Sequence, residues 1–196
     1  MPESSETKEK RYKWRREDYR ENTKGLLMVN TGDGKGKTTA AIGVLVRAAG
    51  RGLKCCMIQF MKSKTDRYGE HESLEKLGVE IHTMGDGFTW DTNDRTQDIK
   101  TSEGTWALCV EKMRSEEYEL LVFDELVYVL DYKFLDLNAV IDEIKEVRSK
   151  QPHLHIIATG RNAPPELIEA ADLVTEMNEI KHPFHAGIYA QQGIEF

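Results

Sequence analysis

Short apolar runs alternate along this chain with longer segments in which apolar residues recur at helical spacing. The short runs predict buried strands, because they are dense in Val, Ile, Leu and Phe and are bounded by polar or glycine-bearing residues. They cover residues 26–29, 54–60, 79–84, 120–125, 153–159 and 171–177. The periodic segments predict helices at 38–49, 71–77, 95–117 and 136–150, with a short helix opening at 164–165. This alternation predicts an α/β fold with a mostly parallel central sheet and helices on both faces.

Two of the helical segments show which residues they bury. In residues 136–150, Asp136 is the expected N-cap, and the inward positions are Val140, Ile141, Ile144 and Val147. In residues 95–117 the apolar positions at roughly helical spacing are Ile99, Trp106, Val110 and Met113. Both helices are therefore expected to pack one face on the sheet.

A glycine-rich loop joins the first predicted strand to the first predicted helix, with the sequence Thr31-Gly-Asp-Gly-Lys-Gly-Lys-Thr-Thr39. Glycines let the backbone bring N–H groups close to an anion, and the positive end of the following helix points to the same place. Lys37 would reach a phosphate as a point charge, and the Thr38 hydroxyl would bind Mg²⁺. We therefore expect a polyphosphate to be bound by Gly32, Asp33, Gly34, Lys35, Gly36, Lys37, Thr38 and Thr39.

The loop departs from the common phosphate-binding pattern at one position. In G-x-x-x-x-G-K-[ST], counting back from Gly36 places Thr31 where the first glycine is expected, and Gly32 follows one residue late. The phosphates are therefore expected to lie differently from those of the common pattern. An ordinary glycine-rich turn is the alternative interpretation, but strand, loop, Gly-Lys-Thr and apolar helix occur in the order that nucleotide binding requires.

Two later strands are followed by charged residues at the edge of the sheet where ligands of α/β proteins gather. Four apolar residues precede Asp124 and Glu125, a pattern that holds Mg²⁺ opposite a phosphate loop, directly or through water. Thr38, Asp124 and Glu125 are therefore candidate metal ligands, the alternative being a pair of exposed acids at a strand end. Arg161 follows the next strand and is a candidate contact for phosphate, ribose or another anion, although a loop arginine is often only solvated.

Two large aromatic residues, Phe88 and Trp90, stand in a polar loop that contains glycine. In a strand they would face the same way and would anchor the core. The other interpretation is a ligand contact, and the sequence pattern leaves both open.

Composition and charge narrow the expected location and partners. The chain has 196 residues, of which 39% are hydrophobic and 31% charged, which suits about one domain. No run approaches the roughly 20 apolar residues of a membrane span, and the polar start shows no secretory signal, so we expect a cytoplasmic protein with no membrane partner. Residues 1–24 hold eight Lys and Arg against six Asp and Glu, which leaves 19 against 28 in the rest. Because residues 25–196 are this acidic, they would repel nucleic-acid phosphates, and no nucleic-acid partner is expected.

The uneven composition also divides the chain. Residues 1–24 are expected to form a charged arm, and residues 25–196 the P-loop α/β domain. The arm interleaves basic residues with Tyr12, Trp14 and Tyr19. It is either a solvated tail or a segment that orders over a ligand as a lid.

The cysteines and the C-terminal histidines do not indicate a metal site. Cys55, Cys56 and Cys109 show no C-x-x-C spacing. Cys55 and Cys56 are neighbours in a predicted strand, where they would face opposite sides as small apolar residues. His182 and His185 have no further Cys or His cluster beside them in the sequence.

Several segments taken together resemble the CobA/BtuR-type ATP:corrinoid adenosyltransferases. Besides the phosphate loop they are Arg47-Ala-Ala-Gly-Arg-Gly52, Gln59-Phe60, Gly87-Phe-Thr-Trp90, Asp124-Glu-Leu126, Thr159-Gly-Arg161, Lys181-His-Pro-Phe184 and Ala190-Gln-Gln-Gly-Ile-Glu-Phe196. The match covers roughly residues 25–196. Its specificity lies in the combination, because a phosphate loop alone would imply only a nucleotide.

The resemblance implies that the 5′-deoxyadenosyl group of ATP is transferred to the cobalt of a reduced corrinoid, cob(I)alamin or cobinamide, in adenosylcobalamin biosynthesis or salvage. Triphosphate is released, with Mg²⁺ as cofactor and Lys37 in a catalytic role. Phe88 and Trp90 match an aromatic pair that excludes the axial ligand from the lower face of the corrin. The family also implies a flavodoxin-like reductant, a homodimer, and an N-terminal arm that helps to cover the active site.

Two other functions remain open at this stage. The first is a small-molecule phosphotransferase or ATPase that acts at the γ-phosphate, with Lys62, Lys64 and Arg67 as a charged lid. The second is a non-enzymatic module that senses nucleotide or carries a corrinoid. Product identity separates the three.

Overall fold

The structure, a computed structural model, describes residues 23–63, 65, 67–85 and 95–195. The predicted N-terminal arm, except for its last two residues, and the aromatic pair Phe88 and Trp90 lie outside the described residues.

A six-stranded sheet forms the centre of the molecule, and every neighbouring pair of strands is parallel. Its strands are β1 (Leu27–Thr31), β2 (Cys55–Ser63), β3 (Glu80–Gly85), β4 (Leu120–Asp124), β5 (His155–Thr159) and β6 (Leu173–Glu176). Their spatial order is β3-β2-β4-β5-β1-β6. The predicted parallel α/β architecture is confirmed, and β1, β2, β4 and β5 therefore bring their carboxyl ends to the same edge of the sheet.

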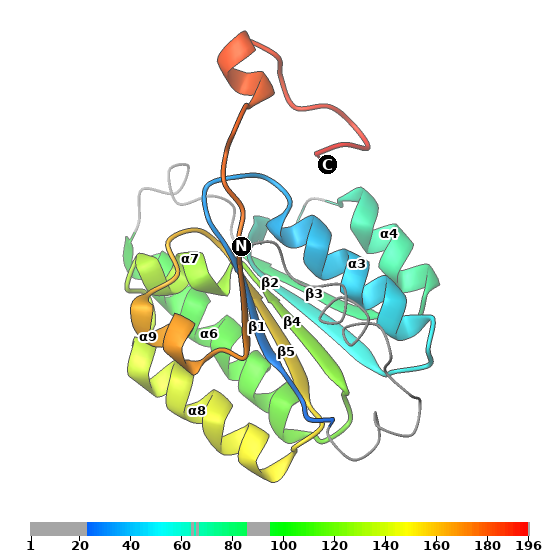
Figure 1. Ribbon diagram of the computed structural model, residues 1–196, viewed down its shortest axis with the longest axis vertical. Coiled ribbons are helices and arrows are strands. Elements are labelled where there is room, and N and C mark those ends of the chain that lie inside the picture. The colour runs from blue at the N-terminus through cyan, green and yellow to red at the C-terminus, as the bar shows by residue number, and fades with distance from the viewer. Residues whose placement is uncertain (1–22, 64, 66, 86–94, 196) are drawn as a thin grey trace, which may run out of the picture.

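Helices cover both faces of this sheet, as Figure 1 shows. On one face lie α3 (Lys37–Ala49) and α4 (Gly69–Lys76), and on the other lie α6 (Arg95–Arg114), α7 (Leu126–Asp131), α8 (Leu137–Lys150) and α9 (Pro165–Ala170). Each face has its own core, the smaller around Leu45 and Met57 and the larger around Phe123 and Ile144, all of them fully buried. The predicted N-cap of α8 is confirmed, since the Asp136 carboxylate accepts a hydrogen bond from the Ala139 N–H at 2.8 Å.

Three features of the fold differ from the sequence-based predictions. Helix α7 was not predicted, because its apolar sequence directly continues that of β4 and shows no start signal of its own. Strand β2 continues to Ser63, past the predicted end at Phe60. A short 3₁₀ helix, Pro183–Ala186, interrupts the tail.

The buried face of α6 also differs from the predicted one. Ser102, Thr105, Cys109 and Met113 are buried, whereas Ile99, Trp106 and Val110 are only partly buried against the core. The Ser102 hydroxyl donates to the Asp98 carbonyl at 2.7 Å and the Thr105 hydroxyl to the Thr101 carbonyl at 2.8 Å. Because these hydroxyls are satisfied within the helix, they can be buried at little cost, and apolar periodicity alone does not reveal them.

The three cysteines behave as predicted from their spacing. All three are buried and free. Cys55 belongs to the core under α3 and α4, and Cys56 to the core on the opposite face. The prediction that these two neighbours face opposite sides of a strand is confirmed.

Beyond β6 the chain leaves the domain as a C-terminal tail, residues 177–195, which rises above the carboxyl ends of the strands in Figure 1. Large apolar side chains on it are exposed, namely Ile180, Phe184, Ile188, Tyr189 and Ile194. Near its end, Glu195 is paired with Lys35 of the glycine-rich loop at 2.6 Å. In the described part of the chain, no helix is both long and apolar enough to span a bilayer.

Asp172, just before β6, holds the start of β1. Its carboxylate accepts from the Leu27 N–H at 2.8 Å and pairs with Lys24 and Arg148, and its own N–H donates to the Leu27 carbonyl at 2.8 Å. Burial opposes ionisation of this carboxyl, but these donors outweigh it and lower its pKa from 3.8 to about 2. Stability from the ionised group is therefore present above about pH 4 and is lost as the pH falls towards 2.

Replacing Asp172 by Asn is therefore expected to lower the free energy of unfolding at pH 7 by about 1 to 3 kcal/mol, and by progressively less below about pH 4. Urea denaturation between pH 7 and pH 3 measures both effects. Asp142→Asn, at an exposed position of α8, is the matched control and should stay close to wild type. A loss that is the same at every pH would show that ionisation of Asp172 is not what stabilises β1.

Candidate active site

The glycine-rich loop connects β1 to α3 at the carboxyl edge of the sheet. Gly32 has a φ of 93° and Gly36, the N-cap of α3, a φ of 112°, a region that other residues rarely adopt. A Cβ on Gly32 would also lie 2.5 Å from the Met177 carbonyl oxygen. Loop, glycines and helix N-terminus thus have the arrangement that the sequence predicts.

Thr31, the residue that replaces the first glycine of the common pattern, is the last residue of β1 and is buried. Its side-chain hydroxyl accepts a hydrogen bond from the Ala163 N–H at 3.0 Å. The positive φ comes one residue later, at Gly32. The departure from the pattern therefore ties the glycine-rich loop to the loop that carries Arg161.

One loop amide is already used inside the protein. The Gly34 N–H donates to the Met177 carbonyl at 2.7 Å, so in the structure this amide is satisfied within the protein. The chain after β6 therefore supports the loop from outside.

Lys37 lies within the curve of the loop and is 8% exposed. Its ammonium group donates to the Gly32 and Gly34 carbonyls, each at 2.7 Å. Burial, partly opposed by nearby Glu125, lowers the pKa of this lysine. The side chain is a buried cation directly beside the helix N-terminus.

Asp124, at the end of β4, is fully buried and accepts hydrogen bonds from three elements. Its Oδ1 accepts from the hydroxyls of Thr38 at 2.7 Å and Thr159 at 2.8 Å. Its Oδ2 accepts from the Gln59 amide at 3.2 Å. The structure thus brings together Thr38 and Asp124, two of the three predicted metal ligands, and adds Gln59 and Thr159.

Glu125, the third predicted metal ligand, follows Asp124 in a left-handed conformation with a φ of 64°. Its N–H donates to the Thr159 hydroxyl at 2.9 Å, and its side chain faces a cavity beside Lys37. Burial, and then the neighbouring Asp124, raise the pKa of Glu125 to about 7. The two acids therefore differ in environment, which their adjacency in the sequence does not show.

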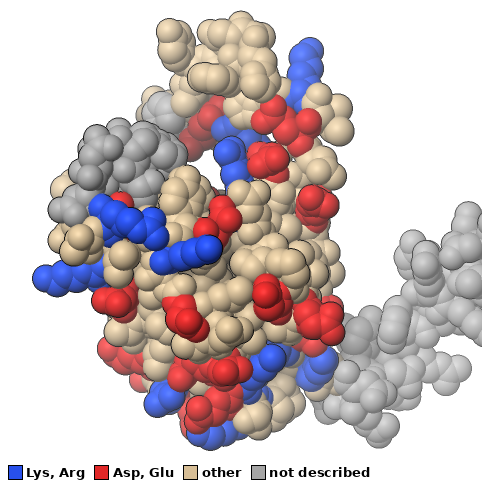
Figure 2. Space-filling model, turned by 90° about the vertical axis from the view of Figure 1, so that its left-hand side faces the viewer, with Lys and Arg blue, Asp and Glu red and all other residues tan. Residues whose placement is uncertain are grey.

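The cavity beside Lys37 has a volume of about 390 Å³. Its lining residues carry both signs of charge and two tyrosines: Asp33, Lys37, Met61, Glu125, Tyr128, Asp131, Tyr132, Arg161 and Asn162. Figure 2 shows basic and acidic side chains close together around a gap beneath the C-terminal tail. Lys35, which pairs with Glu195, and Thr39, exposed on α3, are not among the lining residues.

A larger open groove of about 790 Å³ adjoins this cavity, and the two share Asp131 and Asn162. Apolar residues contribute most of its lining, including Ile99, Leu130, Phe134, Leu135, Leu137 and Pro164. The Arg95 guanidinium lies 5.1 Å from the Phe134 ring centroid. Arg95, the first described residue after residues 86–94, therefore lies next to this groove.

The donor set at Asp124 fits a hard divalent cation. Thr38 and Asp124 supply hydroxyl and carboxylate oxygens within 2.7 Å of each other, and Mg²⁺ prefers such ligands. These two oxygens at the carboxyl edge of the sheet are therefore of the kind that could hold such a cation.

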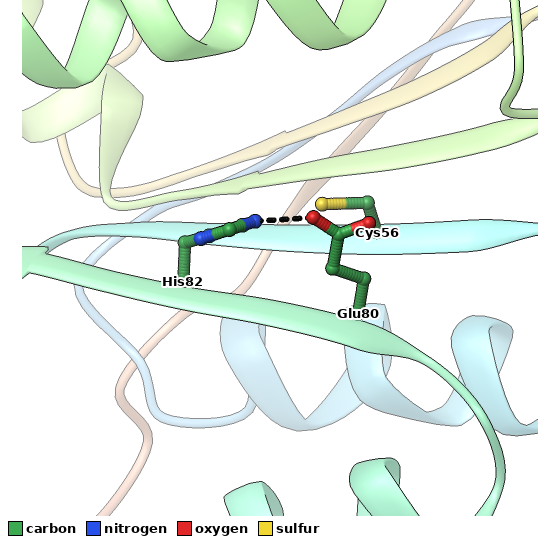
Figure 3. A group of neighbouring side chains, drawn as sticks. All are labelled: Cys56, Glu80 and His82. Atoms are coloured by element: carbon green, nitrogen blue, oxygen red, sulfur yellow. Dashed lines mark hydrogen bonds and ion pairs between the residues drawn. The ribbon is translucent and has the colours of Figure 1, made fainter.

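A second group of ligand types, Cys56, Glu80 and His82, lies on β2 and β3 away from the cavity (Figure 3). The three ligand atoms lie within 4.8 Å of one another, but Glu80 already accepts from His82 at 2.5 Å, from Lys112 at 2.8 Å and from the Tyr118 hydroxyl. Burial opposes ionisation of Glu80, yet these donors lower its pKa to about 2, and burial raises the pKa of the Cys56 thiol to about 12. We interpret this group as a closed polar network.

The phosphotransferase interpretation uses Lys62, Lys64 and Arg67 as a charged lid, and the structure pairs two of these cations with acids. Lys62 is paired with Glu70, and Arg67 with Glu75 at 2.8 Å. Both acids, Glu70 and Glu75, belong to α4. Lys64 lies outside the described residues.

The pKa of Glu125 makes stability depend on pH with a definite sign. Its value is raised from 4.5 to about 7, so between these values the folded protein binds a proton more tightly than the unfolded chain, and stability falls as the pH rises through this range. Glu125→Gln removes this loss. Without metal or nucleotide, the variant is expected to match wild type near pH 4.5 and to exceed its free energy of unfolding by up to about 3 kcal/mol at pH 8.

Urea denaturation in a chelating buffer from pH 4.5 to pH 8 measures this difference. Glu169→Gln, exposed on α9, serves as the matched control. A difference between Glu125→Gln and wild type that does not change with pH would contradict the raised pKa.

Solved structures with similar folds support the architecture. The flagellar accessory protein FlaH from Methanocaldococcus jannaschii superposes with a TM-score of 0.54 at 8% identity, over 78% of this chain and 70% of FlaH. The KaiC-like protein PH0186 from Pyrococcus horikoshii gives a TM-score of 0.50 at 14% identity, over 81% of this chain and 75% of that one. At such low identity the likeness shows the fold alone, which is P-loop NTPase-like.

Sequence comparisons are more specific. Residues 23–196 match the profile of the family described as ATP:corrinoid adenosyltransferase BtuR/CobO/CobP. The corrinoid adenosyltransferase of a Sinorhizobium species is 45% identical over 177 residues, 88% of this chain and 81% of its own length. Those of Pseudomonas aeruginosa and Escherichia coli K12 are 41% and 38% identical, over 88% and 90% of this chain and 84% and 88% of their own lengths. This chain therefore belongs to the family of ATP:corrinoid adenosyltransferases.

Proposed function

We propose that this protein transfers the 5′-deoxyadenosyl group of ATP to the cobalt of a reduced corrinoid, cob(I)alamin or cobinamide, in adenosylcobalamin biosynthesis or salvage. The observation that carries the proposal is 38% to 45% identity, over most of both chains, to proteins named corrinoid adenosyltransferase. In the reaction a bond forms between cobalt and C5′, the C5′–O bond breaks, and its electron pair leaves with triphosphate.

The phosphate side of the site follows from the contacts of the loop. Lys37 and Arg161 line the same cavity, so both would face the departing triphosphate, together with residues Gly32–Thr38 of the loop. Thr38 and Asp124 would hold Mg²⁺, with Glu125 next to them on the cavity. Bound there, the ion would supply positive charge that offsets the charge of the triphosphate.

Reduced cobalt is itself a strong nucleophile, so the protein need not provide one. Its tasks are to align C5′ for in-line attack and to stabilise the charge that develops on the leaving group. Lys37, held by two loop carbonyls at the N-terminus of α3, would serve the second task together with Arg161. The hydrogen bond between the Ala163 N–H and the Thr31 hydroxyl ties the loop that carries Arg161 to the loop that carries Lys37.

The corrinoid side is proposed to use the aromatic pair. Phe88 and Trp90 would lie against the lower face of the corrin and exclude the axial ligand, which favours reduction of cob(II)alamin to cob(I)alamin. The apolar groove supports this placement, because Arg95, only five residues after Trp90 in the sequence, lies beside the Phe134 ring that lines it. A flavodoxin-like protein would deliver the electron.

Three further parts of the proposal concern the whole molecule. Residues 1–24 would act as a lid over a P-loop domain of residues 25–196. The protein would work as a homodimer, and the exposed apolar side chains of the C-terminal tail suit burial against another chain. ATP and a flavodoxin-like donor would be met in the cytoplasm.

A phosphotransferase or ATPase is the second candidate function. The observation in its favour is that Lys37, Thr38 and Asp124 have the arrangement with which P-loop enzymes act on a γ-phosphate. The two reactions differ in their products. With ATP, Mg²⁺ and chemically reduced corrinoid, adenosyl transfer gives an alkyl-cobalt absorption spectrum and triphosphate, whereas phosphoryl transfer gives ADP.

Replacing Lys37 by Ala is expected to lower the adenosylation rate at least about 100-fold, because a buried cation beside the leaving group is removed. The rate is measured by alkyl-cobalt absorbance and by triphosphate release. Lys145→Ala, at an exposed position of α8, is the matched control and should turn over like wild type.

A wild-type rate in Lys37→Ala would contradict the phosphate role of this lysine. ADP as the stoichiometric product of the wild-type protein would favour the phosphotransferase. Binding of both ATP and corrinoid without turnover under reducing conditions would indicate a carrier or sensor.

Replacing Phe88 and Trp90 by Ala is expected to slow the reaction that starts from cob(II)alamin with a protein reductant more than the reaction that starts from preformed cob(I)alamin. The reason is that axial-ligand exclusion assists reduction and not alkyl transfer. Parallel initial-rate assays from the two starting states measure the ratio. Equal losses in both assays would contradict the ligand-exclusion role.

A further inference from the structure

We propose that His71, acting through Gln59, is a positioning residue that fixes the orientation of the Asp124 carboxylate for the magnesium–triphosphate complex. The inference rests on the proposed role of Asp124 as a metal ligand. It deepens that role by assigning a function to two buried residues outside the phosphate loop, on β2 and α4.

The position of the proton on His71 follows from its contact with the backbone. The Tyr68 N–H lies 3.3 Å from His71 Nδ1 and is directed at it. A backbone N–H can only donate, so Nδ1 is the accepting nitrogen and Nε2 carries the proton. Burial lowers the pKa of His71, which is consistent with a neutral ring in this tautomer.

The protonated nitrogen in turn orients Gln59. His71 Nε2 lies 2.8 Å from Gln59 Oε1, and the Thr83 hydroxyl donates to the same oxygen at 3.1 Å. The carbonyl end of the amide is therefore directed towards α4 and β3. The NH₂ end faces Asp124 Oδ2 at 3.2 Å.

The opposite orientation of the amide would be unfavourable at both ends. It would place the Gln59 carbonyl against a carboxylate, which only accepts, and its NH₂ against the Nε2–H of His71. Gln59 is 1% exposed and His71 5%, so water cannot readily satisfy the misdirected groups. A single backbone N–H thus sets the direction of hydrogen bonding from α4 to Asp124.

The effect on the site comes through the second carboxylate oxygen. Thr38 and Thr159 both donate to Oδ1, and the Gln59 amide holds Oδ2. Donors on both oxygens fix the plane of the carboxylate, and outer partners of this kind typically change metal affinity by 10- to 100-fold. His71 and Gln59 are expected to act at this level, without touching the nucleotide.

The experiment compares the affinity for ATP with and without Mg²⁺ by equilibrium titration, which needs no corrinoid and no turnover. His71→Leu removes the donor, and Gln59→Met removes the amide. Each is expected to reduce the Mg²⁺-dependent gain in ATP affinity about 10-fold or more. His71→Gln, whose amide can place an N–H near the position of Nε2, is expected to restore most of the gain.

A matched control separates positioning from loss of stability. Leu74→Ala on α4 removes a fully buried side chain of the core under the same helix. It is expected to lower the melting temperature while leaving the Mg²⁺-dependent gain unchanged. The double variant His71→Leu/Gln59→Met should lose no more than the stronger single variant, because both changes interrupt one path.

Asp124→Asn distinguishes failure of this inference from failure of the proposed metal site. If Asp124→Asn abolishes the Mg²⁺-dependent gain and both His71→Leu and Gln59→Met keep it, the positioning role is wrong and the metal site stands. If Asp124→Asn itself keeps the full gain, both are wrong. Additive losses in the double variant would also overturn the single path.

Discussion

The buried carboxylate of Asp124 is the constraint on which the rest of the site depends. A charge without solvent contact costs several kcal/mol unless it is paired or hydrogen-bonded, and Asp124 is fully buried. Donors reach it from β2 through Gln59, from α3 through Thr38 and from β5 through Thr159. Because these donors come from segments far apart in the sequence, they converge only when the parallel sheet has its observed strand order. The same groups fix the orientation of the carboxylate that we propose as a ligand of Mg²⁺.

The strand order explains why the phosphate loop and the acid face each other. Strand β4 lies between β2 and β5, and β5 lies next to β1, so the residues at the ends of these strands form one row at the carboxyl edge. Helix α3 leaves β1 at this row and brings Thr38 to Asp124. Burial then gives the two neighbouring acids different properties: Asp124 is held by donors on both oxygens, whereas Glu125 faces the cavity with a pKa raised to about 7. Two adjacent residues thus provide a carboxylate held by hydrogen bonds and a separate carboxyl group whose pKa is about 7.

Much of this arrangement could be predicted from the sequence because it depends on local patterns. The strand runs, the glycine spacing and the acids that end β4 each have a signal within a few residues, and together they predicted the sheet and the grouping of Thr38 with Asp124 and Glu125. The buried face of α6 could not be predicted in this way, since Ser102 and Thr105 hide their polarity in hydrogen bonds to the preceding turn. Gln59 and Thr159 were not predicted as partners of Asp124. Each is a polar residue in the carboxyl-terminal part of a predicted strand, and that position could have indicated them. The helix that follows Glu125 was missed because its apolar sequence continues that of the strand.

The position at which the phosphate loop departs from the common pattern shows how specificity is added to a general fold. Thr31 keeps strand geometry and uses its hydroxyl to hold the Ala163 N–H, and Gly32 takes the positive φ one residue later. At the same time the Gly34 amide is engaged by the Met177 carbonyl. The loop is thereby held by Ala163, in the loop after β5, and by Met177, just after β6, and a glycine at position 31 could not make the first of these contacts with a side chain. The departure from the common pattern therefore changes the loop itself, because it adds a side-chain contact to the loop that carries Arg161.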